Sequence, residues 1–536
     1  NALPASGSPG PVDKDSLRAY RSGYLPRERR EIEHGLRAGT VRAVAATNAL
    51  ELGVDIGGMD AVVMAGYPGT IAATWQQAGR GGRGDQPSVA VLVTSSSPLD
   101  QFLALHPAYF FGRSPERALI NPDNPLILLD HLRCAAFELP FSPAEGFGLV
   151  TGEVVAEYLD FLAQTGELTS SAQKFFWTSS DYPAQNISLR TASPKRVLLQ
   201  TRAGPEGEPP RTIGEVDGDS APWMAHPGAI YLHDAESFLV ESLDLENGLA
   251  QLRPIETDYY TEAKRDTEVA LVEQAAFSPV TGGCKAHGDI QVTTQVTGFR
   301  KIQWFTQERL GEEVLEMPPF HLLTTGYWVS LSEEMVEALQ AEGVWNSSPN
   351  AYGPLWPRLR EATRARDGYR CQSCGVPEDG RAHDVHHRTP FRAFASPEQA
   401  NQPSNLVTLC PACHRRAEAV VRVRTGLSGL GHVLGSLAPL FLMCDAADLH
   451  VHTDPQSPLG EGQPTVVIYE QVPGGVGLSA SLYASHEALA AAAWELVSGC
   501  GCTEGCPSCV GPGGELGAGG KEETREILGR MGIGNW

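Results

Sequence analysis

The chain has 536 residues, of which 42% are hydrophobic, and its 64 acidic and 41 basic side chains give a formal net charge of −23. This length suits roughly three to five domains of about 100–200 residues, and the composition excludes a predominantly disordered protein. The acidic average does not exclude a polyanion as partner, because net charge describes the whole surface and not one groove.

Membrane insertion is not predicted. The longest strongly apolar run, Leu434 to Cys444, is shorter than the ~18 residues that a membrane-spanning helix needs. The first residues also lack the charged-then-apolar pattern of a secretory signal. We therefore expect a cytoplasmic protein with no membrane partner.

The N-terminal part of the chain, residues 1–113, alternates between helical and strand-like patterns. After a Pro/Gly/Ser-rich start, the sequence predicts two short helices, one on each side of Pro26. Short apolar runs then predict three buried strands, at residues 41–47, 59–66 and 88–95. This alternation predicts an α/β unit with a parallel sheet.

The middle of the chain predicts two further domains. Residues 114–204 predict a small winged-helix-like module, with helices at 124–141 and 154–166 and strands at 187–192 and 196–202. Residues 205–343 alternate between apolar and polar side chains, which predicts an antiparallel β-rich domain.

A change of composition marks an insertion at residues 344–425. Residues 351–425 contain 12 Arg, no Lys and seven acids, so their charge is 12 − 7 = +5, whereas the rest of the chain carries −23 − 5 = −28. Helical and strand patterns resume at 426–536, and we expect this part to continue the β-rich domain.

The cysteines fall into two groups of four, with Cys134, Cys284 and Cys444 left over. The groups are Cys371, Cys374, Cys410 and Cys413, and Cys500, Cys502, Cys506 and Cys509. Closely spaced pairs of this kind suit tetrahedral zinc better than a disulfide framework and fit a reducing compartment. Two structural zinc ions are therefore predicted, with free thiols as the alternative.

Two N-terminal stretches carry a family resemblance. Residues 46–70, ATNALELGVDIGGMDAVVMAGYPGT, and residues 75–84, WQQAGRGGRG, resemble motifs V and VI of superfamily 2 helicases, close to the MrfA-like branch. The spacing Q-x-x-G-R-x-x-R brings two guanidinium groups near one helix start, where they suit a transferring γ-phosphate. The alternative is a Gly-rich turn with solvated arginines.

The resemblance implies individual roles for these residues. Arg80 and Arg83 correspond to the arginine-finger pair, and Thr47 to a contact with the DNA backbone. The residues expected to face ATP and its Mg²⁺ are Gly53, Asp55, Gln76, Gly79, Arg80 and Arg83.

Such enzymes bind ATP between two RecA-like lobes, and the first lobe supplies a phosphate-binding loop. The motif G-x-x-x-x-G-K-[ST] does not occur in this sequence, because Gly520-Lys521 is followed by Glu522. We expect that stretch to be a flexible linker. The resemblance implies that an N-terminal RecA-like lobe of the same polypeptide is the missing partner, and that this chain alone has negligible ATPase activity.

The C-terminal cysteine group has the spacing C-x-C-x₃-C-x₂-C. It resembles the four-cysteine clamp that closes the zinc-binding domain of MrfA-like helicases. The implied role is architectural.

The inserted segment resembles HNH endonucleases of the ββα-metal class. A basic helix leads into Cys371-x-x-Cys374; the paired histidines of VHHRTPF and Asn405 follow, and Cys410-x-x-Cys413-His414 ends the series. Phosphodiester cleavage needs a cation that neutralises the phosphate and a base that takes a proton from water, and histidine can serve either purpose. Adjacent residues of a strand point to opposite faces of the sheet, so one histidine can bind the cation while the other acts as the base.

The resemblance implies His386 as a ligand of a catalytic Mg²⁺, Mn²⁺ or Zn²⁺ and His387 as the general base. Asn405 would fix the loop that carries the base, and His414 would be the second metal ligand. Glu418, one helical turn beyond His414, would complete the site. Asp384 is a weaker rival ligand, and His383 is expected to be a solvated loop residue.

Arginines near these motifs are expected to contact DNA phosphates. They are Arg358, Arg360, Arg364, Arg366, Arg388, Arg392, Arg415 and Arg416. Such contacts also fit the alternative that the insert is a catalytically silent, zinc-stabilised DNA-binding module. A third hypothesis is an HNH enzyme that keeps the helicase part only as a scaffold.

The predicted fold class is multidomain α/β plus α+β. It combines a RecA-like helicase lobe, a winged-helix-like module and a β-rich zinc-binding domain interrupted by a ββα-metal HNH domain. The predicted function is that of the C-terminal part of an ATP-dependent DNA helicase with an HNH endonuclease, in DNA repair or defence.

Overall fold

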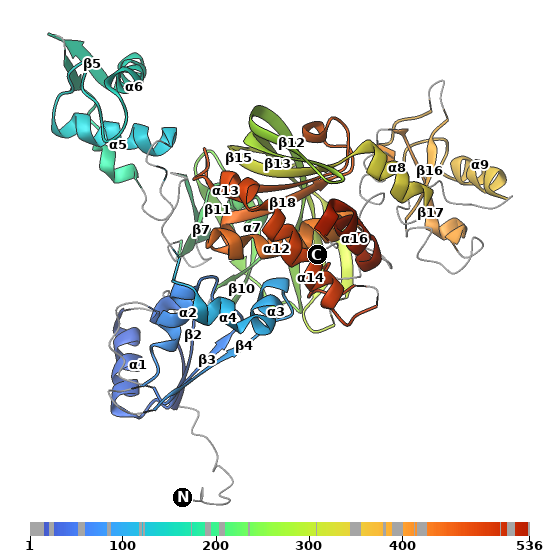
Figure 1. Ribbon diagram of the computed structural model, residues 1–536, viewed down its shortest axis with the longest axis horizontal. Coiled ribbons are helices and arrows are strands. Elements are labelled where there is room, and N and C mark those ends of the chain that lie inside the picture. Colours follow the sequence, from blue (N-terminus) through green and yellow to red (C-terminus); the bar gives the residue numbers. More distant parts are fainter. Residues whose placement is uncertain are drawn as a thin grey trace, which may run out of the picture. The chain divides into compact units, whose positions relative to one another are not determined.

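The computed structural model (Figure 1) divides into two compact units. The first contains residues 1–118, 344–447 and 487–536, and the second contains 119–343 and 448–486. The structure describes residues 16–20, 26–51, 59–82, 87–116, 121, 124–172, 174–187, 195–202, 210–233, 236–306, 308–342, 355–378, 382–388, 400–411, 413–414, 426–503, 505–511 and 520–533. None of the helices in these ranges is long and apolar enough to cross a bilayer.

The N-terminal part of the first unit contains short parallel strand pairs. Its elements are β1 (Leu17–Tyr20), α1 (Pro26–Ala38), β2 (Ala43–Ala46), β3 (Ala61–Ala65), α2 (Ile71–Ala78), β4 (Val89–Val93), α3 (Pro98–Leu105) and α4 (Pro107–Gly112). Strand β1 pairs with β2, and β3 with β4, both in parallel. The parallel α/β prediction is confirmed.

Two local predictions in this part are wrong. Residues Leu17–Tyr20 form strand β1 and not a helix, because they pair with β2. The three predicted strands are also not buried: Val63 is 66% exposed and Val93 is 53% exposed. The exposed apolar side chains include Val63 of β3 and Val89, Val91 and Val93 of its partner β4.

The winged-helix module of the second unit consists of α5 (Pro125–Glu138), α6 (Gly152–Gln164), β5 (Leu168–Ser171) and β6 (Lys174–Trp177). Leu128, Leu132 and Ala136 repeat every four residues along α5 and pack against α6. The wing is the antiparallel hairpin of β5 and β6, so the strand predicted at 196–202 forms but does not belong to the wing. Residues 188–192 lie outside the described ranges, and residues 196–201 belong to another sheet.

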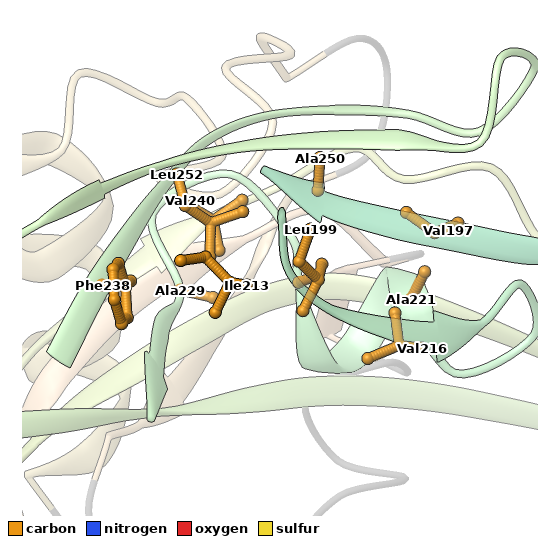
Figure 2. Close-up of a cluster of buried hydrophobic side chains, with 11 residues drawn as sticks. Val197, Leu199, Ile213, Val216, Ala221, Ala229, Phe238, Val240, Ala250 and Leu252 are labelled. Carbon is orange, nitrogen blue, oxygen red and sulfur yellow. The ribbon is translucent and has the colours of Figure 1, made fainter. Parts of the chain in front are cut away.

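A five-stranded sheet follows the module. Its elements are β7 (Arg196–Thr201), β8 (Thr212–Asp217), α7 (Ala221–Met224), β9 (Ile230–His233), β10 (Glu236–Asp244) and β11 (Leu249–Pro254). The strand order is β8-β7-β11-β10-β9, and only the β7–β11 pair is parallel. Figure 2 shows the core on one face, where alternate residues such as Val197 and Leu199 point inward.

A six-stranded antiparallel sheet forms the rest of the second unit. Its strands are β12 (Tyr259–Val280), β13 (Gly283–Gln303), β14 (Arg309–Val314), β15 (Phe320–Leu331), β18 (Leu449–Asp454) and β19 (Thr465–Glu470), and the helices α8 (Glu333–Ala341) and α13 (Leu478–Ala484) accompany them. Strand β15 pairs with β19, with Gly326 opposite Tyr469. The chain therefore leaves this sheet after β15 and returns to it more than a hundred residues later.

The residues between β15 and β18 include the predicted insertion. Its described elements are α9 (Trp356–Arg366), β16 (Asp384–His387) and β17 (Leu406–Leu409), which lie together in Figure 1. Helix α12 (Gly426–Leu442) follows, and α14 (His486–Gly499) and α16 (Gly520–Leu528) end the first unit. Helix α16 packs against α12, where Thr524 Oγ1 donates to Gly426 O at 3.2 Å.

Candidate functional site

The two adjacent histidines lie on strand β16, which pairs antiparallel with β17. His386 is opposite Val407 and His387 is opposite Leu406. Because side chains alternate along a strand, the two rings meet different neighbours. The His386 ring lies against His414, whereas the His387 ring lies against Trp356.

His387 is held on two sides. The Trp356 ring at the start of α9 stacks on its imidazole with 5.1 Å between centroids and 17° between planes. Nε2 of His387 lies 2.9 Å from Oδ1 of Asn401, and both residues are buried. A carboxamide oxygen only accepts, so Nε2 carries the proton and Nδ1 carries the lone pair. Burial lowers the pKa of His387, which keeps the imidazole neutral.

Asn405 connects the loop before β17 to strand β16. Its Nδ2 donates to Ala400 O at 2.9 Å, and its own carbonyl accepts from Arg388 N at 2.7 Å. Asn405 thus fixes the backbone next to Asn401 and the backbone next to His387.

His386 and His414 form the second half of the site. Their ring centroids are 5.5 Å apart with a 78° interplanar angle, and Asp384 Oδ2 lies 3.4 Å from His414 Nδ1. Burial, with the neighbouring His414, lowers the pKa of His386 to about 4. A neutral imidazole is the form that binds metals. Glu418 lies outside the described residues.

The four cysteines of this segment surround one point. Their sulfur atoms all lie within 4.8 Å of one another, with 3.7 Å between Cys374 Sγ and Cys410 Sγ. Four ligands at about 2.3 Å from a tetrahedral Zn²⁺ would stand about 3.8 Å apart. Burial opposes a charge on the Cys371 thiol, but backbone N–H groups outweigh it and lower its pKa to about 6. The cluster fits zinc.

Several basic residues serve the fold of this segment. Arg364 forms two hydrogen bonds with the carboxylate of Glu378, at 2.7 and 2.6 Å, and Arg366 donates to Pro403 O and Leu406 O. In this structure both arginines donate to protein acceptors, and their contact with DNA phosphates stays a prediction. Arg360 Nη2 lies 3.6 Å from Asp384 Oδ1.

The prediction for His383 is wrong. This residue is only 4% exposed, and its backbone N–H donates to Glu378 Oε1 at 2.9 Å. Its Nε2 lies 3.0 Å from Val376 O. His383 ties the start of β16 to the first cysteine knuckle. Arg392, Arg415 and Arg416 lie outside the described residues.

The C-terminal cysteines form a second compact cluster. Cys500 Sγ lies 3.5 Å from Cys502 Sγ and 3.6 Å from Cys506 Sγ, and Cys509 Sγ lies 3.6 Å from both Cys502 Sγ and Cys506 Sγ. The backbone N–H of Cys506 points at Cys509 Sγ over 3.4 Å. These spacings also match the edges of a tetrahedral zinc–sulfur site.

The Gly520-Lys521 pair is not a linker. Both residues begin helix α16, and Lys521 is buried, so the prediction is wrong there. Residues 512–519, which precede them, lie outside the described ranges.

The helicase-like residues lie at the end of α2. Thr70 caps the start of this helix, Gly79 caps its end, and Arg80 follows with Nη2 donating to Glu51 O at 2.5 Å. The expectation of a helix start at the arginines is wrong, because the helix has already ended at Ala78. Met59 and Gly81 form an isolated parallel β-bridge, which joins the first helicase-like stretch to the second.

The remaining residues of this group are placed as follows. Gln76 is exposed near the end of α2, and Thr47 Oγ1 accepts from Ala49 N at 3.4 Å. Gly53, Asp55 and Arg83 lie outside the described residues.

Three residues at these sites were not predicted. Asn401 and Trp356 touch His387 across long stretches of sequence, and Lys521 contacts the C-terminal cysteine loop. Trp356 stands next to the basic residues of α9 in the sequence, and this position could have indicated an aromatic residue at the site. No spacing rule singles out Asn401.

Family models match four parts of the chain. They are "Helicase conserved C-terminal domain" at residues 14–85, "ATP-dependent helicase HRQ1, winged helix domain" at 120–192, "HNH endonuclease" at 371–419 and "MrfA Zn-binding domain" at 430–510.

Similar proteins include ATP-dependent helicases. The chain is 34% identical over 97% of its length to an uncharacterized ATP-dependent helicase, YprA, of Bacillus subtilis, and 28% identical over 64% to the ATP-dependent helicase HRQ1 of Saccharomyces cerevisiae. It spans 58% of the first protein and 32% of the second.

A crystal structure of the DUF1998 helicase MrfA bound to DNA is similar with a TM-score of 0.53 and 33% identity, over 96% of this chain and 57% of that one. This chain is therefore similar over almost its whole length to the DUF1998 helicase MrfA, and the match to the HNH endonuclease model lies next to the match to the MrfA zinc-binding model.

Proposed function

We propose that this chain works within an ATP-dependent DNA helicase and that its HNH segment hydrolyses DNA phosphodiester bonds with a divalent metal. The observation that carries the proposal is the division of the two histidines of β16. His386 lies against His414, which contacts Asp384, and His387 is fixed by Asn401 and Trp356. A ligand and a base need such separate surroundings.

In this proposal His387 takes a proton from the attacking water through Nδ1. The Asn401 carboxamide holds the proton on Nε2, and the Trp356 ring restricts rotation of the imidazole. The buried position keeps the ring neutral near neutral pH. Asn405 supports both segments of backbone that bring these groups together.

His386 and His414 would hold the catalytic metal, with Asp384 or Glu418 as a carboxylate partner. Two neutral imidazoles and a carboxylate fit Mn²⁺ and Zn²⁺ and also allow Mg²⁺. A bound cation would neutralise the charge that develops on the phosphate and on the leaving oxygen.

The domain division supports a combined activity. Residues 1–113 would form the C-terminal RecA-like lobe, 114–204 the winged-helix module, and 205–343 with 426–536 the zinc-binding domain around the HNH segment at 344–425. In the full polypeptide, Arg80 and Arg83 would contact ATP bound against an N-terminal lobe, and Thr47 would contact the DNA backbone. Translocation and cutting would be coupled, in DNA repair or in defence against foreign DNA.

The test is nicking of supercoiled plasmid DNA in the presence of Mg²⁺, Mn²⁺ or Zn²⁺. We expect His387→Ala to lower the rate by ~100-fold or more, because general bases contribute about 10²–10⁴-fold. His131→Ala, which removes an exposed histidine of the winged-helix module, is the matched control and should cut like the wild type. Zinc content and far-ultraviolet circular dichroism should stay unchanged in both variants.

Two outcomes would contradict the proposal. Equal cutting by the wild type and His387→Ala would remove His387 as the base. A wild type that binds DNA but cuts with none of the three metals would favour a catalytically silent DNA-binding module.

A further inference from the structure

Lys521 is buried beside the C-terminal cysteine cluster. Only 9% of the residue is exposed, and its Nζ donates to the carbonyl oxygens of Cys500 and Cys502, each at 2.5 Å. Lysine is almost never buried unless its charge is paired. Both acceptors are backbone oxygens of cluster cysteines, so the ammonium group is tied to the loop that carries two of the sulfur ligands.

The charge of Lys521 does not suit its position in the helix. Lys521 is the second residue of α16, and the start of a helix carries a partial positive charge that favours acids, such as the adjacent Glu522 and Glu523. A cation there is unfavourable for the helix itself. The carbonyl oxygens of Cys500 and Cys502 in the cysteine loop offset part of this cost.

A zinc ion with four thiolates supplies further compensation. Four thiolates around one Zn²⁺ leave a net charge of about −2, and a partly buried anion of this kind is stabilised by a nearby cation. The Lys521 stem is also close to the loop, because a Cβ added at Gly505 would lie 3.8 Å from Lys521 Cβ.

We propose that Lys521 is a positioning residue of the C-terminal zinc site. Its ammonium group, held by the Cys500 and Cys502 carbonyls, offsets the negative charge of the four thiolates and slows the loss of the metal. A role in anchoring the helix alone does not require this lysine, because Thr524 already binds α16 to α12 through Gly426 O.

The test follows release of zinc from the full chain to an excess of a chromogenic chelator. We expect Lys521→Met to accelerate the release of one zinc equivalent by about 10–100-fold, the usual effect of removing a group that supports metal ligands. Lys521→Arg should keep the slow rate, since it keeps the charge. Cys506→Ser, which removes a ligand, identifies the phase that belongs to this cluster.

Two matched variants separate charge from helix packing. Arg525→Met removes an exposed cation from the same helix, and Thr524→Val removes the hydrogen bond to Gly426 O. Both should release zinc at the wild-type rate. Wild-type release in Lys521→Met would overturn the proposal, and so would equally fast release in Thr524→Val, because the lysine would then act only through helix docking.

Substitution of cobalt(II) for zinc gives an absorption spectrum that reports on the metal site and not on the packing of helix α16. Removal of the adjacent positive charge should shift the sulfur-to-cobalt charge-transfer bands in Lys521→Met and leave them in place in Thr524→Val. Identical spectra in wild type and Lys521→Met would contradict an electrostatic role, even if α16 loosens in the variant.

Discussion

A histidine can act as a base only when a particular ring nitrogen keeps its lone pair and the ring is held toward the water. At His387 the neighbours decide both conditions. The Asn401 oxygen accepts from Nε2 at 2.9 Å, and Trp356 covers one ring face. The adjacent His386 has neither contact among the described residues and lies against His414 instead. Two identical side chains thus acquire different chemistry from their surroundings.

Asn401→Ala tests this view. The variant loses the acceptor that fixes the Nε2 proton, so a fraction of the His387 rings adopts the other tautomer or another orientation. We expect the nicking rate to fall on the order of tenfold, less than the loss of the base itself. Gln402→Ala, which truncates the exposed neighbour, is the control. An unchanged rate in Asn401→Ala would show that the hydrogen bond does not position the base.

The residues of this site were predictable only in part. Motif spacing identifies His386, His387, Asn405 and His414, because each stands at a fixed offset from a cysteine knuckle. Asn401 is different, since its contact with His387 depends on the path of the intervening loop. His383 was misjudged for a related reason: its burial depends on Glu378 and Val376, which the fold of the knuckle brings to it.

At the scale of elements, the winged-helix module depends on one ion pair between a helix and the wing. Arg133 of α5 donates to both carboxylate oxygens of Glu167, at 2.7 and 3.1 Å, and Glu167 directly precedes β5. The two side chains are 27% and 25% exposed. The hydrogen bonds from Arg133 lower the pKa of Glu167 below its ordinary value of 4.5.

Glu167→Gln should therefore destabilise the module in a pH-dependent way. A carboxylate whose pKa is lowered by folding adds stability above its unfolded pKa and loses it as the pH falls through the folded value. We expect a loss of about 1 kcal/mol at pH 7 that shrinks below about pH 4.5. Urea unfolding of the full chain, followed by tryptophan fluorescence at several pH values, measures the loss, and Glu153→Gln is the control. A difference independent of pH would contradict the ion pair as its cause.

Elements were predictable where local pattern decides them. The spacing of apolar residues identifies α5 and α6, which the structure confirms. The wing was assigned too far along the chain, because residues 196–201 alternate like a hairpin strand. They pair instead in parallel with β11, about fifty residues later. Local alternation shows that a strand forms but not which strand it joins.

At the scale of the whole molecule, the HNH segment lies, along the chain, between two strands that pair with each other. Strand β15 precedes the segment and β19 follows it, and five residue pairs join them in antiparallel register. Thr324 Oγ1 adds hydrogen bonds to Glu470 O and Val472 O at 3.0 and 2.8 Å. The sheet therefore combines strands from before and after the segment, and neither β16 nor β17, the described strands of residues 344–425, belongs to it.

Excision of residues 344–425 tests this organisation. With a flexible Gly/Ser linker of about 20 residues in their place, we expect the six-stranded sheet to form, because none of its strands is lost. Bound zinc should fall from two equivalents to one, and nicking should disappear, since His386, His387 and His414 are removed. The companion variant keeps the intact chain and replaces the four cysteines of this segment, Cys371, Cys374, Cys410 and Cys413, by serine. It should also lose one zinc equivalent. A soluble excised chain that loses both zinc ions and its cooperative unfolding would show that the segment is part of the zinc-binding domain's core and not an insertion.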